Sequence, residues 1–420
     1  MLVMIMVLMS SMMVGVDYWG VGAVVLSGLL LDVVVSLDFE PLVYGYGFLD
    51  FVGSFMLVMS LILFYLMLMG SYESKSLLYV SVYLGMVVFV LTSFMMVSFL
   101  GFYVMFEASM IPMIMILMGW GYQEERVGAM FYMMVYTVFS SLMMLVGLSV
   151  MGGWLKMMVS VEGSGEGVSF LLVMVVFLVK LPMYGLHIWL PKAHVEASTA
   201  GSMVLAGVLL KLGGYGLVRL MGQLGGSLMG KGSLVIMGLL GGIFSGLMCL
   251  RQVDLKRMVA YSSISHMSFV IAGFVSGSVL SLMGMVVVMV GHGFSSSGLF
   301  FLSGVVSKVG GSRSIYMMKR WGAKMGGLVA ILCAMNMSVP PSVGILGELM
   351  IYMGVSSLSG VLDVVMGVIS FVVGGYSMYM YSVVGRSQGV DGGYIFMSDY
   401  YVLVYHMVVF MGGGSLICLL

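Results

Sequence analysis

The amino-acid sequence predicts an all-α protein that crosses a membrane many times. Of its 420 residues, 61% are hydrophobic and only 8% are charged, whereas soluble domains carry about 25% charged residues. The apolar residues form runs of roughly 17 to 25 residues, the length that an α-helix needs to cross a hydrocarbon core of about 30 Å. These runs lack the alternation of apolar and polar residues that is typical of membrane β-barrels. We therefore expect a single transmembrane domain over residues 1–420.

The apolar runs predict about fourteen membrane-spanning helices. The first run begins at Met1 without the basic segment or cleavage site of a signal peptide, so we interpret it as the first span. The second run contains Asp32, the fourth and fifth runs adjoin directly, and no break is long enough for a soluble domain. The predicted spans are residues 1–16, 20–36, 49–70, 77–98, 99–119, 128–151, 168–190, 197–221, 233–250, 258–276, 279–304, 325–353, 361–385 and 399–420.

Lysine and arginine are distributed unevenly between the two ends of these spans. The breaks after odd-numbered spans hold Lys75, Arg126, Lys192, Arg251, Lys256, Arg257, Lys308, Arg313, Lys319, Arg320 and Lys324. The breaks after even-numbered spans hold only Lys156, Arg219, Lys231 and Arg386. Basic residues are in excess in loops on the cytoplasmic side of membranes. We therefore expect the breaks after odd-numbered spans to face the cytoplasm-like side and both termini to face the opposite side.

Prolines interrupt the seventh and twelfth predicted spans. Pro182 lies in the seventh span, and Pro340 and Pro341 lie in the twelfth, five helices further along the chain. This spacing is typical of transporters built from two inverted five-helix repeats, each with a broken helix. We expect the repeats at about 77–221 and 233–385, flanked by helices in 1–70 and 399–420. A carbonyl that loses its hydrogen bond at such a break is expected to face water or an ion within the protein.

Four ionisable residues lie well inside apolar runs: Glu107, Lys180, Lys211 and Glu348. A charge at mid-membrane costs about 2.5 to 3.5 kcal/mol, so the four together cost on the order of 10 kcal/mol. Locked ion pairs, or side chains that extend to the membrane surface, would explain a single charge. Two acids and two bases near mid-span instead favour a path for protons or ions across the membrane.

Histidine and serine add polar groups to the same region. His292 lies in the eleventh span, with Ser295 and Ser296 three and four residues later on the same helical face. Imidazole titrates near neutral pH, and hydroxyl groups hold ordered water, so this face is a candidate part of a proton path. His266 is expected to open the tenth span beside several hydroxyl groups. A core histidine bonded to a hydroxyl group is the alternative interpretation.

Further candidates for relay or gating follow the break in the seventh span. His187 comes seven residues after Lys180 and would share its face if the helix resumed after the proline. Lys192, His194 and Glu196 are expected in the break that follows, where solvation by water explains them equally well. The sequence alone leaves both interpretations of these three residues open.

Other classes of chemistry find no support in the sequence. Histidine pairs with metal-binding spacing are absent, and Cys249, Cys333 and Cys418 each lie alone in an apolar run. The chain lacks a phosphate-binding GxxxxGK[ST] motif, a GxGxxG motif after a strand and a CxxC pair. It carries 17 basic and 17 acidic residues, so its net charge indicates no nucleic-acid partner.

Several segments resemble a known family. FLVKLPMYGLHIWLPKAHVEASTAGSMVLAGVLLKLGGYG (177–216), CLRQVDLKRMVAYSSISHM (249–267), GHGFSSSGLFFLSG (291–304) and PPSVGILGEL (340–349) are similar to the mitochondrial subunit 4 family of NADH dehydrogenase, the antiporter-like membrane subunits of respiratory complex I. The composition, with 60 Gly and 51 Met against a single Asn, is typical of a strand-biased organelle genome. Ser198, Gly344 and Glu124 depart from the family pattern.

The resemblance implies a role for each buried ionisable residue. It matches Glu107, Lys180, Lys211, His292 and Glu348 to the proton-channel residues of the fifth, seventh, eighth, eleventh and twelfth helices. On this basis, opening of a Glu107 and Lys180 pair would release a proton, which Lys211 and His292 would pass to Glu348 as the exit group.

The resemblance also implies where the protein works and with what. It implies the mitochondrial inner membrane, with both termini on the intermembrane-space side. The implied partners are other membrane-arm subunits of complex I, especially neighbouring antiporter-like subunits, together with lipids, protons and internal water. NADH, FMN, iron–sulfur clusters and ubiquinone would all be bound by partner subunits. A subunit of a cation/proton antiporter and a structural membrane scaffold with locked charges are the alternatives.

Overall fold

The computed structural model describes residues 42–44, 47–71, 76–150, 167–221, 231–318, 326–385 and 399–408. The predicted spans 1–16 and 20–36 lie outside these residues, as does most of 399–420. One short antiparallel hairpin pairs β1 (Leu42–Tyr44) with β2 (Gly47–Leu49), with Leu42 opposite Leu49. The rest of the regular structure in the described ranges is helical, which confirms the all-α prediction.

The helices follow the predicted spans closely. They are α3 (Phe51–Gly70), α4 (Leu77–Met95), α5 (Phe99–Ala108), α6 (Met110–Trp120), α7 (Arg126–Val150), α8 (Gly167–Lys180), α9 (Trp189–Glu196), α10 (Thr199–Val204), η2 (Leu205–Leu209), α11 (Leu210–Met221), α12 (Lys231–Leu250), α13 (Leu255–Ser276), α14 (Val279–Gly310), η3 (Ile315–Met318), α15 (Gly326–Asn336), α16 (Val343–Ser356) and α17 (Gly360–Val384), followed by a helical segment at 399–408.

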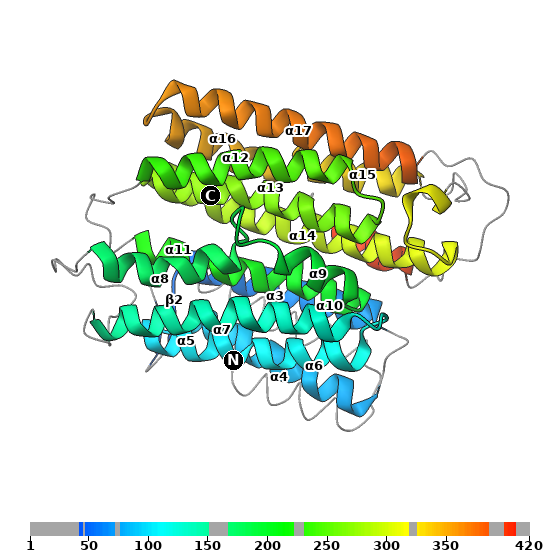
Figure 1. Cartoon of the computed structure of the whole chain (residues 1–420), viewed down its shortest axis with the longest axis horizontal. Helices are drawn as coiled ribbons and strands as arrows, with labels where there is room; N and C mark the ends of the chain where they lie inside the picture. The colour runs from blue at the N-terminus through cyan, green and yellow to red at the C-terminus, as the bar shows by residue number, and fades with distance from the viewer. Residues whose placement is uncertain are drawn as a thin grey trace.

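Within the described ranges, nine helices are long and apolar enough to cross a membrane. Figure 1 shows the helices running side by side, with α4 to α7 on one side, α12 and α17 on the other, and α8 to α11 between them. The central helices are the most enclosed, since 94% of the apolar stretch is buried in Thr199–Met221 and in Leu255–Ser276. Only 28% is buried in Gly360–Val384. The polar residues of the central helices are therefore shielded by protein.

Both predicted helix breaks are present. The seventh span ends as a helix at Lys180 and resumes only at Trp189, and the twelfth is divided between Asn336 and Val343. Because eight non-helical residues follow Lys180, the expectation that His187 lies on the same helical face as Lys180 is wrong.

The tenth span begins earlier than predicted. Helix α13 starts at Leu255, where Asp254 occupies the N-cap position, and ends at Ser276. His266 therefore lies near the middle of the helix, and the prediction that it opens the span is wrong. Apolar periodicity alone placed the start too late because the helix begins with the charged residues Lys256 and Arg257.

An ion pair joins the start of α3 to the end of α11. Both oxygens of the Asp50 carboxylate accept hydrogen bonds from Arg219, at 2.7 and 2.5 Å, and Oδ1 also accepts from the backbone of Gly53 at 2.9 Å as an N-cap. Arg219 donates further to the hydroxyl of Tyr215 at 2.8 Å, which in turn donates to the carbonyl of Phe94. This network fixes α11, which carries Lys211, against α3 and α4.

We expect Asp50→Ala to destabilise the folded protein by about 3 to 5 kcal/mol, because it leaves the buried Arg219 guanidinium without its carboxylate. Thermal unfolding of the solubilised, assembled protein measures this loss. Arg257→Ala is the matched control, because its 3.9 Å pair with Asp254 is 48% and 35% exposed and should contribute less than about 1 kcal/mol. Equal effects of the two variants would contradict the assignment.

Candidate functional site

Glu107 and Lys180 meet inside the bundle, as the sequence predicts. The Nζ atom of Lys180 lies 3.7 Å from Oε1 of Glu107, and their side chains are only 4% and 21% exposed. The ammonium group also lies 4.2 Å from the centre of the Phe106 ring. Neither of these two atoms makes a hydrogen bond within the described residues, because 3.7 Å is longer than a hydrogen bond. The two side chains are therefore close but not locked, with Lys180 buried and Glu107 partly buried.

The helix break holds Lys180 at the end of α8. Pro182 cannot donate a backbone hydrogen bond, and the amide of Met183 bonds to the carbonyl of Leu178 instead, at 3.1 Å. The indole of Trp189 donates to the carbonyl of Val179 at 3.1 Å. The expectation that freed carbonyls at this break face water or an ion is therefore wrong for these two, because protein donors satisfy them.

Lys211 is fully buried and has a backbone partner. Its Nζ atom donates to the carbonyl of Ala206 at 2.6 Å. Ala206 belongs to the π-helical turn η2, where the amide of Leu210 bonds to the carbonyl of Leu205, five residues back. An extra residue in a helix leaves a carbonyl of that turn without its usual donor. The π turn thus offers the ammonium group an acceptor where no carboxylate pairs with it among the described residues.

Two glycines bring α11 close to its neighbours. A methyl group at Gly213 would lie 3.1 Å from Cβ of Lys180, and one at Gly293 would lie 3.6 Å from Cε of Lys211. The stem of Lys211 therefore lies beside the residue that follows His292. Helix α11, which carries Lys211, therefore packs against α8 at Gly213 and against α14 at Gly293.

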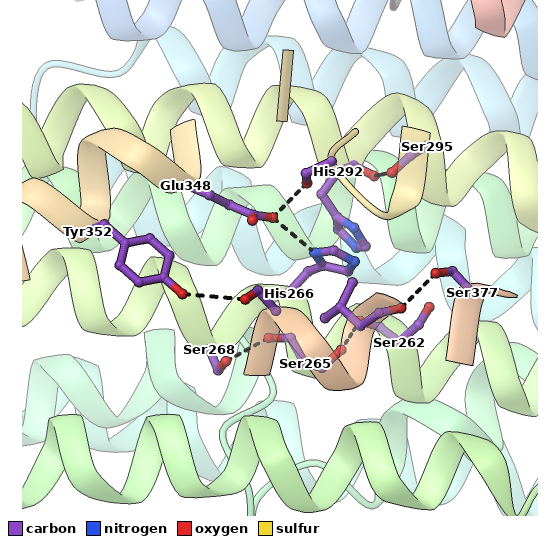
Figure 2. A network of polar contacts seen from close by, with 12 residues as sticks. Ser262, Ser265, His266, Ser268, His292, Ser295, Glu348, Tyr352 and Ser377 are labelled. Atoms are coloured by element: carbon purple, nitrogen blue, oxygen red, sulfur yellow. Dashed lines mark hydrogen bonds and ion pairs between the residues drawn. The ribbon is translucent and has the colours of Figure 1, made fainter. Parts of the chain in front are cut away.

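His266, His292 and Glu348 form a compact cluster between α13, α14 and α16 (Figure 2). The two imidazole rings stack with their centres 5.0 Å apart. Nδ1 of His266 lies 3.9 Å from Oε1 of Glu348, and the hydroxyl of Ser338 donates to the same oxygen at 2.6 Å. Neither ring nitrogen of His292 makes a hydrogen bond within the described part of the chain. The sequence did not predict that His266 would meet His292.

The hydroxyl groups on α14 do not bond to the imidazole of His292. Ser295 and Ser296 each donate to a carbonyl of their own helix, three residues back, at 3.4 Å. Ser295 nevertheless lines a small cavity together with His266, His292 and Glu348. The predicted helical face is therefore present, but water rather than direct contact would have to connect its members.

The residues of the second half of the broken helix are mostly buried. His194 is 0% exposed and stacks on Phe300 with the ring centres 4.2 Å apart. Glu196 is buried too, so solvation by bulk water is the wrong interpretation for these two. Lys192 is exposed and lies over the ring of Tyr132 at 3.3 Å.

His187 is partly exposed and stacks on Tyr184, with its Nδ1 accepting from the amide of Gly185 at 3.1 Å. It lies in the loop between α8 and α9, and no described contact joins it to the buried ionisable groups. His187 therefore stabilises the conformation of the loop.

Sequence reasoning missed a buried cation. Lys256 appeared to be a loop residue, yet it is 2% exposed and donates to the carbonyl of Ala197 at 2.9 Å, at the C-terminal end of α9. A cation at a helix C-terminus is favoured by the helix dipole. Asp254 at an N-cap position was the available signal that Lys256 lies inside a helix.

No group of three or more His, Cys, Asp or Glu side chains could hold a metal ion in the described ranges. Cys249 and Cys333 are buried, and within the described ranges neither is joined in a disulfide. The arrangement places ionisable groups near one another on six helices, α5, α8, α11, α13, α14 and α16, and is suited to changes of protonation at these groups.

The sequence matches a family of known membrane proteins. Residues 97–374 match the model of the NADH:quinone oxidoreductase/Mrp antiporter transmembrane family. The chain is 39% identical to NADH-ubiquinone oxidoreductase chain 4 of Albinaria caerulea, over 85% of each chain. The corresponding protein of Mytilus edulis is 38% identical, over 81% of each chain. The chain belongs to the chain 4 family of NADH-ubiquinone oxidoreductase.

Solved structures share the fold at lower identity. A chain of respiratory complex I from Thermus thermophilus superposes with a TM-score of 0.85 at 20% identity, covering 98% of this chain and 95% of that one. A chain of the Mrp complex from Dietzia sp. gives 0.79 at 14% identity, with 98% and 91% covered. Both predictions for this chain, its family and its antiporter-like fold, are therefore confirmed.

We expect Trp189→Phe to destabilise the broken helix by about 1 to 3 kcal/mol, because the buried carbonyl of Val179 loses its donor. Thermal unfolding of the assembled protein reports the change. Trp120→Phe is the control, since a phenyl ring keeps the edge contact that Trp120 makes with Tyr79 at 5.0 Å. A smaller effect at Trp189 than at Trp120 would contradict a role for the indole at the break.

Proposed function

We propose that this chain is the chain 4 subunit of proton-translocating NADH:ubiquinone oxidoreductase and moves protons along its buried Glu, Lys and His residues. The unlocked Glu107–Lys180 pair carries the proposal, because a buried pair held at 3.7 Å without a hydrogen bond can separate more easily than a bidentate one. The Asp50–Arg219 pair, with two hydrogen bonds of 2.7 Å or less, shows in the same molecule what a locked pair looks like.

The first step is the opening of that pair. When Glu107 moves away, the ammonium of Lys180 loses the charge that stabilises it in a region of low dielectric. Lys180 then gives up its proton toward Lys211, whose helix α11 packs against the end of α8 at Gly213. Water molecules must bridge this step, since protons cross gaps between buried groups through hydrogen-bonded water.

The second step takes the proton from Lys211 to the histidine cluster. Lys211 reaches toward His292 beside Gly293, and the cluster ends at the carboxylate of Glu348. Glu348 is the exit group of the proposal. His194 stacks on Phe300 of α14, the helix that carries His292. It is a further relay residue beside the same proton path.

The proposal requires an external source of energy. Each proton moved against the membrane potential requires about 2.3 kcal/mol per 100 mV. Electron transfer in partner subunits supplies it, and NADH, FMN, iron–sulfur clusters and ubiquinone are bound there. The coupling reaches this chain through neighbouring antiporter-like subunits, whose contact surfaces and surrounding lipids would cover the apolar outer faces of α7 and α17.

We propose that the protein lies in the mitochondrial inner membrane. The relatives at 38% and 39% identity are named as NADH-ubiquinone oxidoreductase chain 4 of animals, which supports this location. The excess of basic residues in the odd-to-even breaks supports termini on the intermembrane-space side. The likeness to the Mrp complex, at 14% identity, concerns the fold, so a free-standing cation/proton antiporter is the weaker reading.

We expect Glu107→Gln and Lys180→Ala each to abolish proton pumping by the assembled complex, because neither variant can form or release the pair. Acidification of membrane vesicles during NADH oxidation measures pumping, and native electrophoresis confirms assembly. Lys308→Ala, at an exposed position near the end of α14, is the control and should pump normally. Normal pumping by either pair variant would defeat the proposal, and sodium-dependent transport by the isolated chain would favour the antiporter.

A further inference from the structure

The single asparagine of the chain lies at the second helix break. Asn336 is the last residue of α15, immediately before the non-helical residues 337–342. Its side chain is 1% exposed, so its amide group is removed from lipid and bulk water. Burying an amide without hydrogen bonds is costly, by about 1 to 3 kcal/mol as judged from protein variants.

The side-chain amide of Asn336 has no regular hydrogen bond to the part of the chain that the structure describes. Both Nδ2 and Oδ1 are buried without a partner in the described residues. The hydroxyl of Tyr376, which shares a 3.0 Å hydrogen bond with Ser265, interacts with the Asn336 side chain without the geometry of a regular hydrogen bond, and the ring of His266 lies close to the Asn336 backbone. A buried polar group in this state usually bonds to an internal water molecule.

A cavity of suitable size lies next to the amide. It has a volume of about 10 Å³ for the centre of a water molecule, enough for about one water. Its polar walls come from His266, His292, Ser295, Asn336, Ser338 and Glu348. A water needs two to four polar partners, and this wall offers them on several sides.

The same cavity lies where the proton path lacks a direct connection. The 3.9 Å between Nδ1 of His266 and Oε1 of Glu348 is too long for a hydrogen bond. His266 and His292 stack face to face, so their ring nitrogens do not point at one another, and three of those four nitrogens have no partner in the described structure. A proton cannot pass between these groups without an intermediary.

We propose that Asn336 is a positioning residue that holds one water molecule in this cavity, through which a proton passes between the histidine pair and Glu348. The water accepts a proton from a protonated imidazole nitrogen and releases another to the carboxylate, so the water is restored and the imidazole becomes neutral. This inference rests on the proposed proton-translocating function. The amide suits the role because it both donates and accepts hydrogen bonds and does not itself take the proton.

Gly344 contributes to the shape of this site. Ser338, with φ of 55°, points its hydroxyl at Glu348, and a methyl group at Gly344 would lie 2.8 Å from that hydroxyl. The departure of the sequence from its family at Gly344 therefore leaves space for Ser338. Asn336 and Ser338 approach Glu348 from the same break.

The test compares Asn336→Leu with the native chain in the assembled complex. Leucine has a similar volume but cannot bind water, so we expect proton pumping to fall by about tenfold or more while the complex assembles. The solvent isotope effect on the remaining activity, measured in D2O, should increase because proton transfer becomes limiting, a change that a purely structural defect would not produce. Asn336→Ser, which keeps a hydroxyl group and leaves room for water, should restore much of the pumping.

Two control variants distinguish loss of the positioned water from other causes of reduced pumping. Ser342→Ala removes another buried hydroxyl without a described partner from the same break, but not from the cavity wall, and should pump like the native chain. Glu348→Gln tests the proposed function itself. If Glu348→Gln stops pumping while Asn336→Leu pumps normally, the water-positioning role is refuted and the proton path stands.

Should Asn336→Leu fail to assemble, the native complex decides. A high-resolution experimental map should show one water between Asn336 and Glu348, and an empty cavity would overturn the inference.

Discussion

The cost of placing charge in a low-dielectric interior is the constraint on which the central helices depend. Each buried cation offsets this cost by interacting with a different partner. Lys180 has a carboxylate at 3.7 Å, Lys211 has a carbonyl of its own helix at 2.6 Å, and Lys256 has the carbonyl at the end of α9 at 2.9 Å. None of these cations is as tightly held as Arg219, whose pair with Asp50 is bidentate. The strength of pairing thus separates the Arg219 charge, which is structural, from the charges that we propose change protonation.

Irregular backbone supplies these partners. In a regular helix each internal carbonyl already accepts one backbone amide, so a carbonyl at an irregular turn is the better acceptor for a buried ammonium group. The π turn at Leu205–Leu209 places an acceptor beside Lys211, and the break after Asn336 lets Ser338 turn toward Glu348. The break after Lys180 works differently, because Trp189 satisfies the nearby carbonyl and leaves Glu107 as the partner of Lys180. Irregularities of this kind are tolerated in a membrane only where protein surrounds them, and the buried side chains Lys211, Ser338 and Asn336 show that protein surrounds them here.

Small residues allow the ionisable groups to approach one another. At Gly213 a methyl group would lie 3.1 Å from the Lys180 Cβ of α8, and at Gly293 of α14 it would lie 2.7 Å from the Met59 sulfur and 3.6 Å from Cε of Lys211. The close crossings place Lys211 between two clusters that lie on different helices. The result is a series of neighbouring groups with short gaps, a geometry in which single water molecules decide whether protons pass.

The sequence by itself determined the fold class, most spans, both helix breaks and the set Glu107, Lys180, Lys211, His292 and Glu348, because apolar run length, proline and misplaced charge are properties of the chain read in order. Tertiary structure alone decided which groups meet. His266 contacts His292 and Glu348 across three helices, His194 is buried against Phe300, and Lys256 is enclosed beside α9. Such contacts depend on helix rotation and crossing, and a sequence pattern gives the face of a helix but not the neighbour that covers it.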